Sequence, residues 1–370
     1  MRVMIILAAM LAGLLVPALA QAAPRGEGDR RLVIVTLDGL PWTEVFRGAD
    51  AARLEVKAFA PGPEAVKAAF AAPGAGPDVR TMALMPFLNG VVARQGVLAG
   101  DRDHGSCVAV GNDRWFSYPG YNEILTGRPD PAIKSNAHGP NANVTLLEWL
   151  NHRPAFAGRV AAVTSWGVFN DILNPGRSGV ALNAGWEGRG PRSPANDALA
   201  TLQADAARIW PDVRQDGFTH AWALDVLRQG RARVLYVSYG ETDDFAHDGR
   251  YDQVLWSANR NDRFIGELWA AIQANPAWRG RTNLIVTTDH GRGQSGGQSW
   301  RSHMSGLAGS DEIWLAALGP DIQPGATVGQ GGACATNGQV AATALTLLGQ
   351  DWRAFDDKAA PPLPILRPGR

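Results

Sequence analysis

Short, continuous apolar runs recur along the chain, and three of them end close to acidic or histidine residues. These runs occupy residues 32–37, 234–238 and 284–288, and consist mostly of Val, Ile, Leu and Thr. Runs of this kind are typical of parallel strands that are buried on both faces. The metal-binding side chains that follow are Asp38 after the first run, Asp243 and His247 after the second, and Asp289 and His290 after the third. Ligands of open α/β sheets gather beyond the carboxyl ends of the strands, so these side chains are predicted to meet.

Further strands and helices alternate along the chain. Strand patterns cover residues 96–98, 159–164 and 313–318. Helical patterns cover residues 82–92, 119–126, 143–151, 196–209, 218–229, 253–274 and 338–349. The alternation predicts an α/β fold, a three-layer sandwich with a central, mainly parallel sheet flanked by helices.

Two segments show no period and are expected to be loops. Residues 50–80 are rich in Ala, Pro and Gly, and residues 165–195 are dense in Gly, Asn, Trp and Pro. Long loops inside a compact domain are usually functional or disordered. The aromatic residues of the second segment, Trp166, Phe169 and Trp186, favour a wall of a substrate site.

The N-terminal residues have the pattern of a cleavable secretory signal. A basic start precedes an apolar stretch, and small residues at Ala18-Leu19-Ala20 or Ala20-Gln21-Ala22 offer cleavage sites. We therefore expect a signal peptide at residues 1–22 and a periplasmic or secreted, soluble protein. No later window approaches the roughly 20 apolar residues of a membrane span. The remainder is expected to form one α/β domain over residues 31–352, followed by a Pro-rich surface tail at residues 353–370.

Charge and cysteine content narrow the function further. The 35 basic and 35 acidic residues balance, which argues against a nucleic-acid-binding surface held by counterion release. The pattern does not indicate an oligomeric state. Cys107 and Cys334 are compatible with one disulfide in an oxidising compartment or with two separate buried thiols.

The acidic and histidine residues match the ligand chemistry of a hydrolytic metal site. Asp243 and His247 are four residues apart and can share one face of a helical turn. With His303 they form a set of two histidines and one carboxylate, as in hydrolytic zinc sites. Asp38, Asp289 and His290 form a second group. Asp289 and His290 are adjacent and converge only if the chain turns there, as the following Gly291 allows.

A serine offers a candidate nucleophile. Ser117 lies two residues before Pro119, and a helical stretch follows that ends at Gly127. Pro suits the first turn of a helix and Gly its C-terminal cap, so Ser117 is expected at a helix N-terminus that favours an anion. A metal ion bound to its hydroxyl oxygen would activate it as a nucleophile. An ordinary helix-capping serine is the alternative. The other histidines, His104, His138, His152 and His220, lack such placement and are expected to be structural or exposed.

The candidate residues lie in five motifs, which follow one another along the chain as Leu37-Asp38-Gly39, Ser117-Tyr118-Pro119-Gly120-Tyr121, Glu241-Thr242-Asp243-Asp244-Phe245-Ala246-His247, Thr288-Asp289-His290-Gly291 and His303. This ordered set resembles the alkaline phosphatase superfamily, and most closely its nucleotide pyrophosphatase/phosphodiesterase-like branch. The resemblance implies a phosphoric ester hydrolase that forms a covalent intermediate on Ser117 and then hydrolyses it. It also implies two zinc ions, with manganese or another divalent metal as alternatives. One would be held by Asp243, His247 and His303, and the other by Asp38, Asp289, His290 and Ser117. Two metal ions about 3.5–4 Å apart would clamp the attacking and leaving oxygens.

Some positions depart from the patterns of the family. Many diesterases of this branch carry Thr as the nucleophile, and sulfatases need an Arg where this chain has Tyr121. An Asn about twenty residues after the nucleophile helps to hold a phosphate oxygen in the family. Asn136 is our choice over Asn141 and Asn143.

The substrate is expected to be a small phosphate ester or a nucleotide, with Tyr118, Tyr121 and Trp166 as substrate contacts. The aromatic side chains would stack on a nucleoside or aryl leaving group. A phosphomonoesterase and a catalytically inactive binding protein of the same fold are the alternatives.

Overall fold

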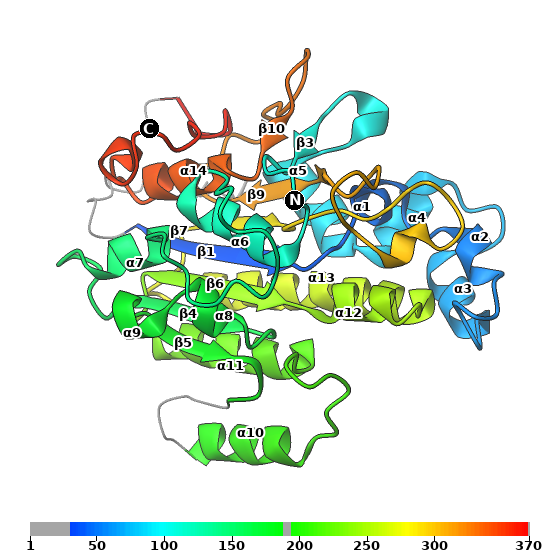
Figure 1. Ribbon diagram of the computed structural model, residues 1–370, viewed down its shortest axis with the longest axis horizontal. Coiled ribbons are helices and arrows are strands. Elements are labelled where there is room, and N and C mark those ends of the chain that lie inside the picture. Colours follow the sequence, from blue (N-terminus) through cyan, green and yellow to red (C-terminus); the bar gives the residue numbers. More distant parts are fainter. Residues whose placement is uncertain (1–29, 188–193, 369–370) are drawn as a thin grey trace, which may run out of the picture.

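A seven-stranded, twisted sheet forms the centre of the molecule (Figure 1). The computed structural model describes residues 30–187 and 194–368, and the predicted signal peptide at residues 1–22 lies outside them. The strands lie in the order β2 (Val97–Ala99), β9 (Leu315–Leu318), β7 (Thr282–Thr287), β1 (Arg31–Leu37), β6 (Val234–Tyr239), β4 (Val160–Thr164) and β5 (Ala181–Ala184). All neighbouring pairs from β7 to β5 are parallel, and β9 is antiparallel to both of its neighbours. The mainly parallel sheet is thus confirmed.

The three strands that precede the predicted ligands are direct neighbours in this sheet. β1 lies between β6 and β7, with Leu37 opposite Tyr239 and Thr36 opposite Thr287. The three strands therefore end at the same level. All their residues are buried, as the continuous apolar runs predicted.

Helices cover both faces of the sheet and complete the three layers. Alternate residues of β1 belong to two separate cores: Val33 and Val35 on one face, Leu32 and Ile34 on the other. The first core is closed by α11 (Asp216–Gln229) and α13 (Tyr251–Ala274). The second is closed by α6 (Ser117–Thr126), α7 (Leu146–Asn151) and α14 (Gln339–Leu347). The remaining α-helices are α1 (Trp42–Arg47), α2 (Ala51–Leu54), α3 (Glu64–Phe70), α4 (Pro77–Leu84), α5 (Ala93–Gln95), α8 (Phe169–Ile172), α9 (Pro175–Ser178), α10 (Pro194–Asp205) and α12 (Glu241–His247).

The first predicted loop is wrong, because α2, α3 and α4 lie within or overlap residues 50–80. Their short lengths explain why no period was visible. The helix predicted over residues 82–92 is interrupted. α4 ends at Leu84, and a π-helical turn covers Leu88–Val92. Met85, before Pro86, adopts φ −133° and ψ 69°, because a residue that precedes Pro is disfavoured in the α region.

The second predicted loop, residues 165–195, is also partly ordered. It contains α8, α9 and the edge strand β5, which pairs with β4. Phe169 is fully buried in the second core and cannot line a substrate site, so this part of the prediction is wrong. The strand predicted over residues 313–318 is split at Trp314 into β8 (Glu312–Ile313) and β9. The indole of Trp314 donates to the carbonyl of Leu40 and anchors the break.

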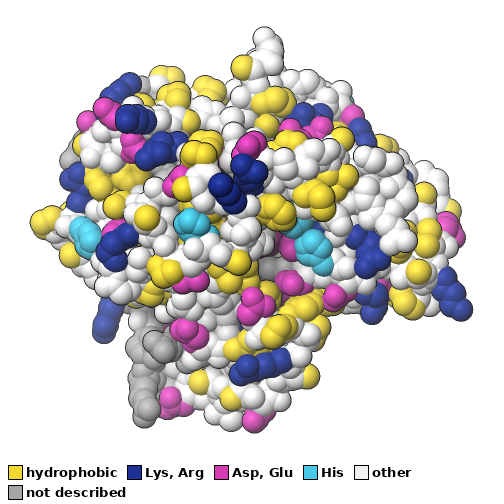
Figure 2. All heavy atoms as spheres, viewed as in Figure 1, with side chains coloured by type: hydrophobic (Ala, Val, Ile, Leu, Met, Phe, Trp, Pro, Cys, Tyr) yellow, Lys and Arg dark blue, Asp and Glu magenta, His cyan; other side chains and the backbone are white. Residues whose placement is uncertain are grey.

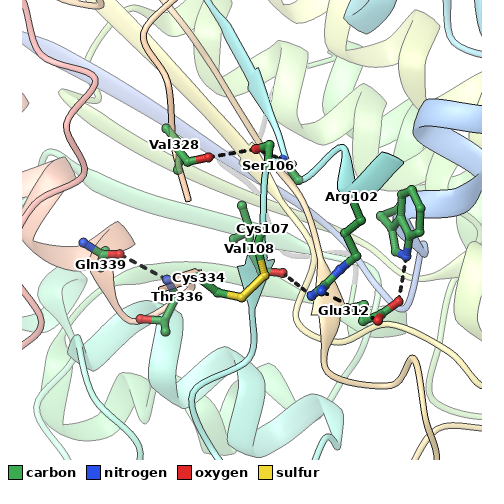
Figure 3. Close-up of a disulfide and its surroundings, with 11 residues drawn as sticks. Arg102, Ser106, Cys107, Val108, Glu312, Val328, Cys334, Thr336 and Gln339 are labelled. Carbon is green, nitrogen blue, oxygen red and sulfur yellow. Dashed lines mark hydrogen bonds and ion pairs between the residues drawn. A yellow bond between two sulfur atoms is a disulfide. The ribbon is translucent and has the colours of Figure 1, made fainter. Parts of the chain in front are cut away.

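A disulfide joins Cys107 to Cys334, which decides between the two alternatives for these cysteines. It links the segments of β3 (Val108–Ala109) and β10 (Ala335–Thr336) (Figure 3). β3 is the central strand of a small three-stranded sheet and pairs with β10 on one side and with β8 on the other. The Pro-rich tail packs against the body, with Leu363 and Ile365 buried. Among the described residues, no helix has the length and apolar character needed to cross a membrane.

Candidate metal centre

The predicted ligands converge beyond the ends of β1, β6 and β7. Asp38, Asp289 and His290 form one group, and Asp243, His290 and His303 form another. Within each group the ligand atoms all lie within 4.8 Å of one another. His247 is adjacent to the second group, since its Nε2 lies 3.1 Å from Nε2 of His303. Figure 2 shows acidic side chains around one histidine near the middle of the face on view.

α12 presents two of the predicted ligands, Asp243 and His247, on the same side of one helical turn, as their spacing predicted. Nε2 of His247 lies 3.2 Å from Oδ2 of Asp243. The helix begins at Glu241, and the buried carboxylate of Asp216 accepts from the backbone N–H of Gly240 at 2.8 Å and of Glu241 at 3.2 Å. Asp216 therefore anchors the first turn of α12. The role of Asp216 could not be predicted from the sequence, because a lone Asp at the start of a helix carries no distinctive signal.

Asp289 and His290 converge because the chain leaves the sheet before it reaches them. β7 ends at Thr287, and the N–H of Gly39 donates to Oδ1 of Asp289 at 3.0 Å. Gly291 does not have a positive φ, which differs from the expected turn. Glycine is required at this position because there is no room for a side chain. A Cβ there would lie 2.3 Å from the carbonyl oxygen of Gly309 and 2.4 Å from that of Glu312.

Two of the histidines are held with one ring nitrogen facing the cluster. Nδ1 of His290 donates to the carbonyl of Gly291 at 2.9 Å, and Nδ1 of His303 donates to the carbonyl of Trp115 at 2.7 Å. The rings stack with centroids 3.6 Å apart. Burial lowers the pKa of His290 to about 4 and that of His303 to about 3. Both rings are therefore neutral at pH 7 and present Nε2 as a lone pair, the state that binds a metal ion.

Two of the carboxylates, Asp38 and Asp289, are buried without an ion pair to a Lys or Arg among the described residues. Burial, followed by the charge of Asp243, raises the pKa of Asp38 to about 7. Burial and then Asp38 raise the pKa of Asp289 well above its usual value. Oδ2 of Asp289 is buried and accepts no hydrogen bond within the described part of the chain. Clustered carboxylates with an unpaired oxygen beside neutral imidazoles fit divalent cations in both groups.

Ser117 is the first residue of α6, and its hydroxyl faces the cluster. Oγ lies 3.2 Å from Nε2 of His290 and 3.4 Å from Oδ1 of Asp38. Phe116 occupies the N-cap position and makes no side-chain capping bond, so Ser117 is not an ordinary capping serine. Gly120 permits this approach, because a Cβ there would lie 2.4 Å from the carbonyl oxygen of Asp289.

The two tyrosines predicted to contact the substrate are fully buried, and this prediction is wrong. The hydroxyl of Tyr121 donates to Oδ2 of Asp38 at 2.9 Å, and that of Tyr118 donates to the carbonyl of Gly139 at 2.7 Å. A ring without exposed surface cannot stack on a substrate. Tyr121 is one helical turn from Ser117, so the spacing alone placed it on the face of α6 that meets the cluster.

Other predicted residues surround the nucleophile. Oδ1 of Asn136 accepts from the N–H of Tyr118 at 2.9 Å, at the N-terminus of α6. Asn141 and Asn143 instead bond to Asn122. Trp166 is half-buried, and its indole donates to Asp212. None of the other described histidines joins a metal-ligand group: His104, His138, His152 and His220.

Arg292 is the main residue of the site that sequence reasoning missed. Its guanidinium is buried, donates to the carbonyl of Gly39 at 3.0 Å and contacts Oδ1 of Asp243. Burial alone would raise the pKa of Asp243, but Arg292 and His247 outweigh it and hold that pKa well below its usual range. In the sequence, its position directly after the Asp289-His290-Gly291 motif could have identified Arg292 as a site residue.

Comparisons with known proteins agree with this geometry. Residues 128–300 match the family model of type I phosphodiesterases and nucleotide pyrophosphatases. This range includes Asp243, His247, Asp289 and His290, whereas Asp38, Ser117 and His303 lie outside it. A search of curated proteins found no significant match.

Solved structures of the alkaline phosphatase superfamily share the fold at low sequence identity. A superfamily protein from Vibrio parahaemolyticus is 14% identical with a TM-score of 0.52, over 87% of this chain and 67% of the other. A putative sulfatase from Bacteroides thetaiotaomicron is 12% identical with a TM-score of 0.52, over 87% and 71%. A phosphonate monoester hydrolase from Silicibacter pomeroyi is 12% identical with a TM-score of 0.51, over 90% and 77%. The resemblance predicted from the motifs is thereby confirmed.

Proposed function

Because the chain has the alkaline phosphatase superfamily fold and matches the type I phosphodiesterase family model over residues 128–300, we propose that it hydrolyses phosphate esters. We place it with the phosphodiesterases and nucleotide pyrophosphatases, acting through a covalent intermediate on Ser117. The observation that carries the proposal is the position of the Ser117 hydroxyl, 3.2 Å from His290 and 3.4 Å from Asp38, within a cluster of neutral imidazoles and carboxylates.

The site is proposed to hold two zinc ions. Asp243, His247 and His303 would hold one, and Asp38, Asp289, His290 and Ser117 would hold the other. When bound, the two cations would neutralise the buried carboxylates, lower the pKa of the Ser117 hydroxyl and stabilise the charge that develops on the phosphoryl oxygens. Manganese or another divalent metal would suit the same oxygen and nitrogen ligands.

Ser117 would perform two displacements at phosphorus. In the first, Oγ gives its proton to solvent and bonds to phosphorus, while the bond from phosphorus to the leaving oxygen breaks and that oxygen takes up a proton to leave as the alcohol. In the second, a water oxygen loses a proton and bonds to phosphorus, the bond to Oγ breaks, and Oγ takes up a proton. Asn136 uses its Oδ1 on Tyr118, so its NH₂ group remains as a donor for a phosphoryl oxygen.

A small phosphate ester or nucleotide is the proposed substrate, and Trp166 the proposed contact for its leaving group. We also propose export to the periplasm. The signal-type pattern at residues 1–22 and the Cys107–Cys334 disulfide support this location, since disulfides persist in oxidising compartments.

Metal content and ester preference test the proposal together. The purified protein should contain two equivalents of divalent metal by mass spectrometry and hydrolyse bis-p-nitrophenyl phosphate faster than p-nitrophenyl phosphate. The reverse rate order would identify a phosphomonoesterase instead. A protein that purifies without stoichiometric metal and hydrolyses neither ester would be identified as an inactive binding protein.

The nucleophile is tested by substitution. Ser117→Ala should abolish turnover and retain the metal, whereas Ser305→Ala, at an exposed serine of the neighbouring loop, should retain both. Activity that survives in Ser117→Ala would refute the covalent mechanism.

A further inference from the structure

One guanidinium group connects the segments that carry the ligands. Arg292 follows β7 and is 3% exposed. Its Nε donates to the carbonyl of Gly39 at the end of β1, at 3.0 Å, and its Nη2 donates to the carbonyl of Asp243 on α12, also at 3.0 Å. Nη2 also contacts Oδ1 of Asp243. Arg292 is therefore a buried, fixed cation inside the ligand cluster.

The cation is not shared equally by the three carboxylates. Within the described residues, Arg292 is paired with Asp243 and forms no ion pair or hydrogen bond with Asp38 or Asp289. Asp38 receives the neutral hydroxyl of Tyr121, and Oδ2 of Asp289 receives no hydrogen bond. Arg292 also lowers the pKa of Asp38, but without direct contact and by less than burial and Asp243 raise it. The carboxylate of the group with His247 and His303 is thus the one that the protein itself neutralises most.

Arg292 has little room to move away from Asp243. Gly39 has φ +58°, and a Cβ at this position would lie 2.8 Å from Nη2 of Arg292 and 2.5 Å from Oδ1 of Asp243. The missing side chain of Gly39 thus creates the space in which the pair forms. Nη1 of Arg292 is buried and has no hydrogen-bond partner among the described residues. Solvent therefore screens the charge of Arg292 only weakly.

We infer that Arg292 makes the two metal positions unequal, so that Asp243, His247 and His303 bind their divalent cation more weakly than Asp38, Asp289 and His290 bind theirs. The inference rests on the proposed two-metal function and deepens it. The guanidinium of Arg292, held on Asp243, repels a metal ion that binds to the same carboxylate, and this repulsion is large in a buried site. Arg292 is accordingly a positioning residue that sets the order of metal loading.

The experiment is a zinc titration of the metal-free protein by calorimetry with a competing chelator. The wild-type protein should bind two equivalents with clearly different dissociation constants. Arg292→Met, which removes the charge and keeps similar length, should tighten the weaker equivalent by about tenfold, or ~1.4 kcal/mol, with the tighter equivalent changed little. Arg292→Lys, which keeps the charge, should remain unequal. Arg47→Met, which removes an exposed Arg paired with Asp103, is the matched control and should match the wild type.

The outcomes separate the inference from the proposed function. Two equal equivalents in the wild-type protein would overturn the inference alone, even if no variant folds. Weaker binding of both equivalents in Arg292→Met, with a lowered melting temperature, would show that Arg292 only ties the segments together. A folded wild-type protein that binds no divalent metal would overturn the proposed metal centre, and the inference with it.

Discussion

Replacement of Tyr121 by Phe removes a single oxygen atom from beneath the candidate metal centre. The Tyr121 hydroxyl donates to Oδ2 of Asp38 at 2.9 Å and accepts from the hydroxyl of Ser238 at 3.2 Å. The ring is fully buried and contacts Phe169, with centroids 4.7 Å apart. Phe keeps this packing, so the substitution isolates the hydrogen bond to the carboxylate.

The expected effect on metal affinity follows from the role of that bond. A hydrogen bond to a charged group contributes about 1.5–3 kcal/mol, and loss of a residue that orients a metal ligand costs about 10- to 100-fold in affinity. The Tyr121 hydroxyl also lowers the pKa of Asp38, against the larger effect of burial. Without it that pKa rises, so protons compete better for Asp38. We therefore expect Tyr121→Phe to weaken zinc binding by about 10- to 100-fold.

Tyr118→Phe provides a matched control on the same helix. Tyr118 is equally buried, but its hydroxyl donates to the carbonyl of Gly139 and to no predicted ligand. Both variants should lose some stability in thermal unfolding of the metal-free protein. Only Tyr121→Phe should lose affinity in a zinc titration, and the loss should grow as the pH falls. Equal zinc affinities in the two variants would refute the assignment of Tyr121 as the residue that orients Asp38.

Four further predictions follow from particular contacts. Gly39→Ala should lower the zinc stoichiometry measured by mass spectrometry, because its φ of +58° disfavours Ala and the Cβ would lie 3.0 Å from the ring of His290, a candidate ligand. Full metal content in this variant would contradict the prediction. Cys107→Ser should lower the free energy of unfolding in urea melts by about 2–5 kcal/mol, because Cys107 closes a loop of 227 residues with Cys334. A reductant should lower the free energy of unfolding of the wild-type protein by a similar amount. Burial raises the pKa of Asp262 from 3.8 to about 7, so the folded state binds its proton more tightly than the unfolded chain. The stability that this proton provides is lost as the pH rises from about 4 to about 7, and Asp262→Asn should flatten the fall in urea-melt stability over that range; an unchanged pH profile would count against it. Trp166→Ala should raise KM for nucleotides and not for small alkyl phosphate esters in steady-state assays, and equal effects on both would exclude Trp166 as a leaving-group contact.

The local pattern of the chain predicted the elements that carry the site. The continuous apolar runs before Asp38, Asp243 and Asp289 identified three buried strands, because parallel strands covered on both faces need apolar side chains at every position. The four-residue spacing of Asp243 and His247 was read correctly as a helical turn. Short elements such as α2 and β5 were not predicted, since four residues are too few to show a hydrophobic period.

Contacts between residues that are far apart in the sequence could not be predicted from these local patterns. Asp216 anchors α12 across 24 residues, and Tyr121 bonds to Asp38 across 83. Tyr121 was predicted to contact the substrate, but its ring is buried and its hydroxyl donates to Asp38. The sequence does not separate these two roles, because an aromatic ring with a hydroxyl suits both. The pairing of Cys107 with Cys334 depended on the small sheet that aligns their strands.

By itself, the sequence determined which strands form and which candidate metal ligands follow them, because hydrophobic period and residue order are local properties. Tertiary structure alone decided how those side chains share charge. The chain places Arg292 on Asp243, leaves an oxygen of Asp289 unpaired and turns Ser117 toward His290. These relations depend on the close approach of backbones at Gly39, Gly120 and Gly291. A glycine in the sequence does not reveal which distant atoms will occupy the space of its missing side chain.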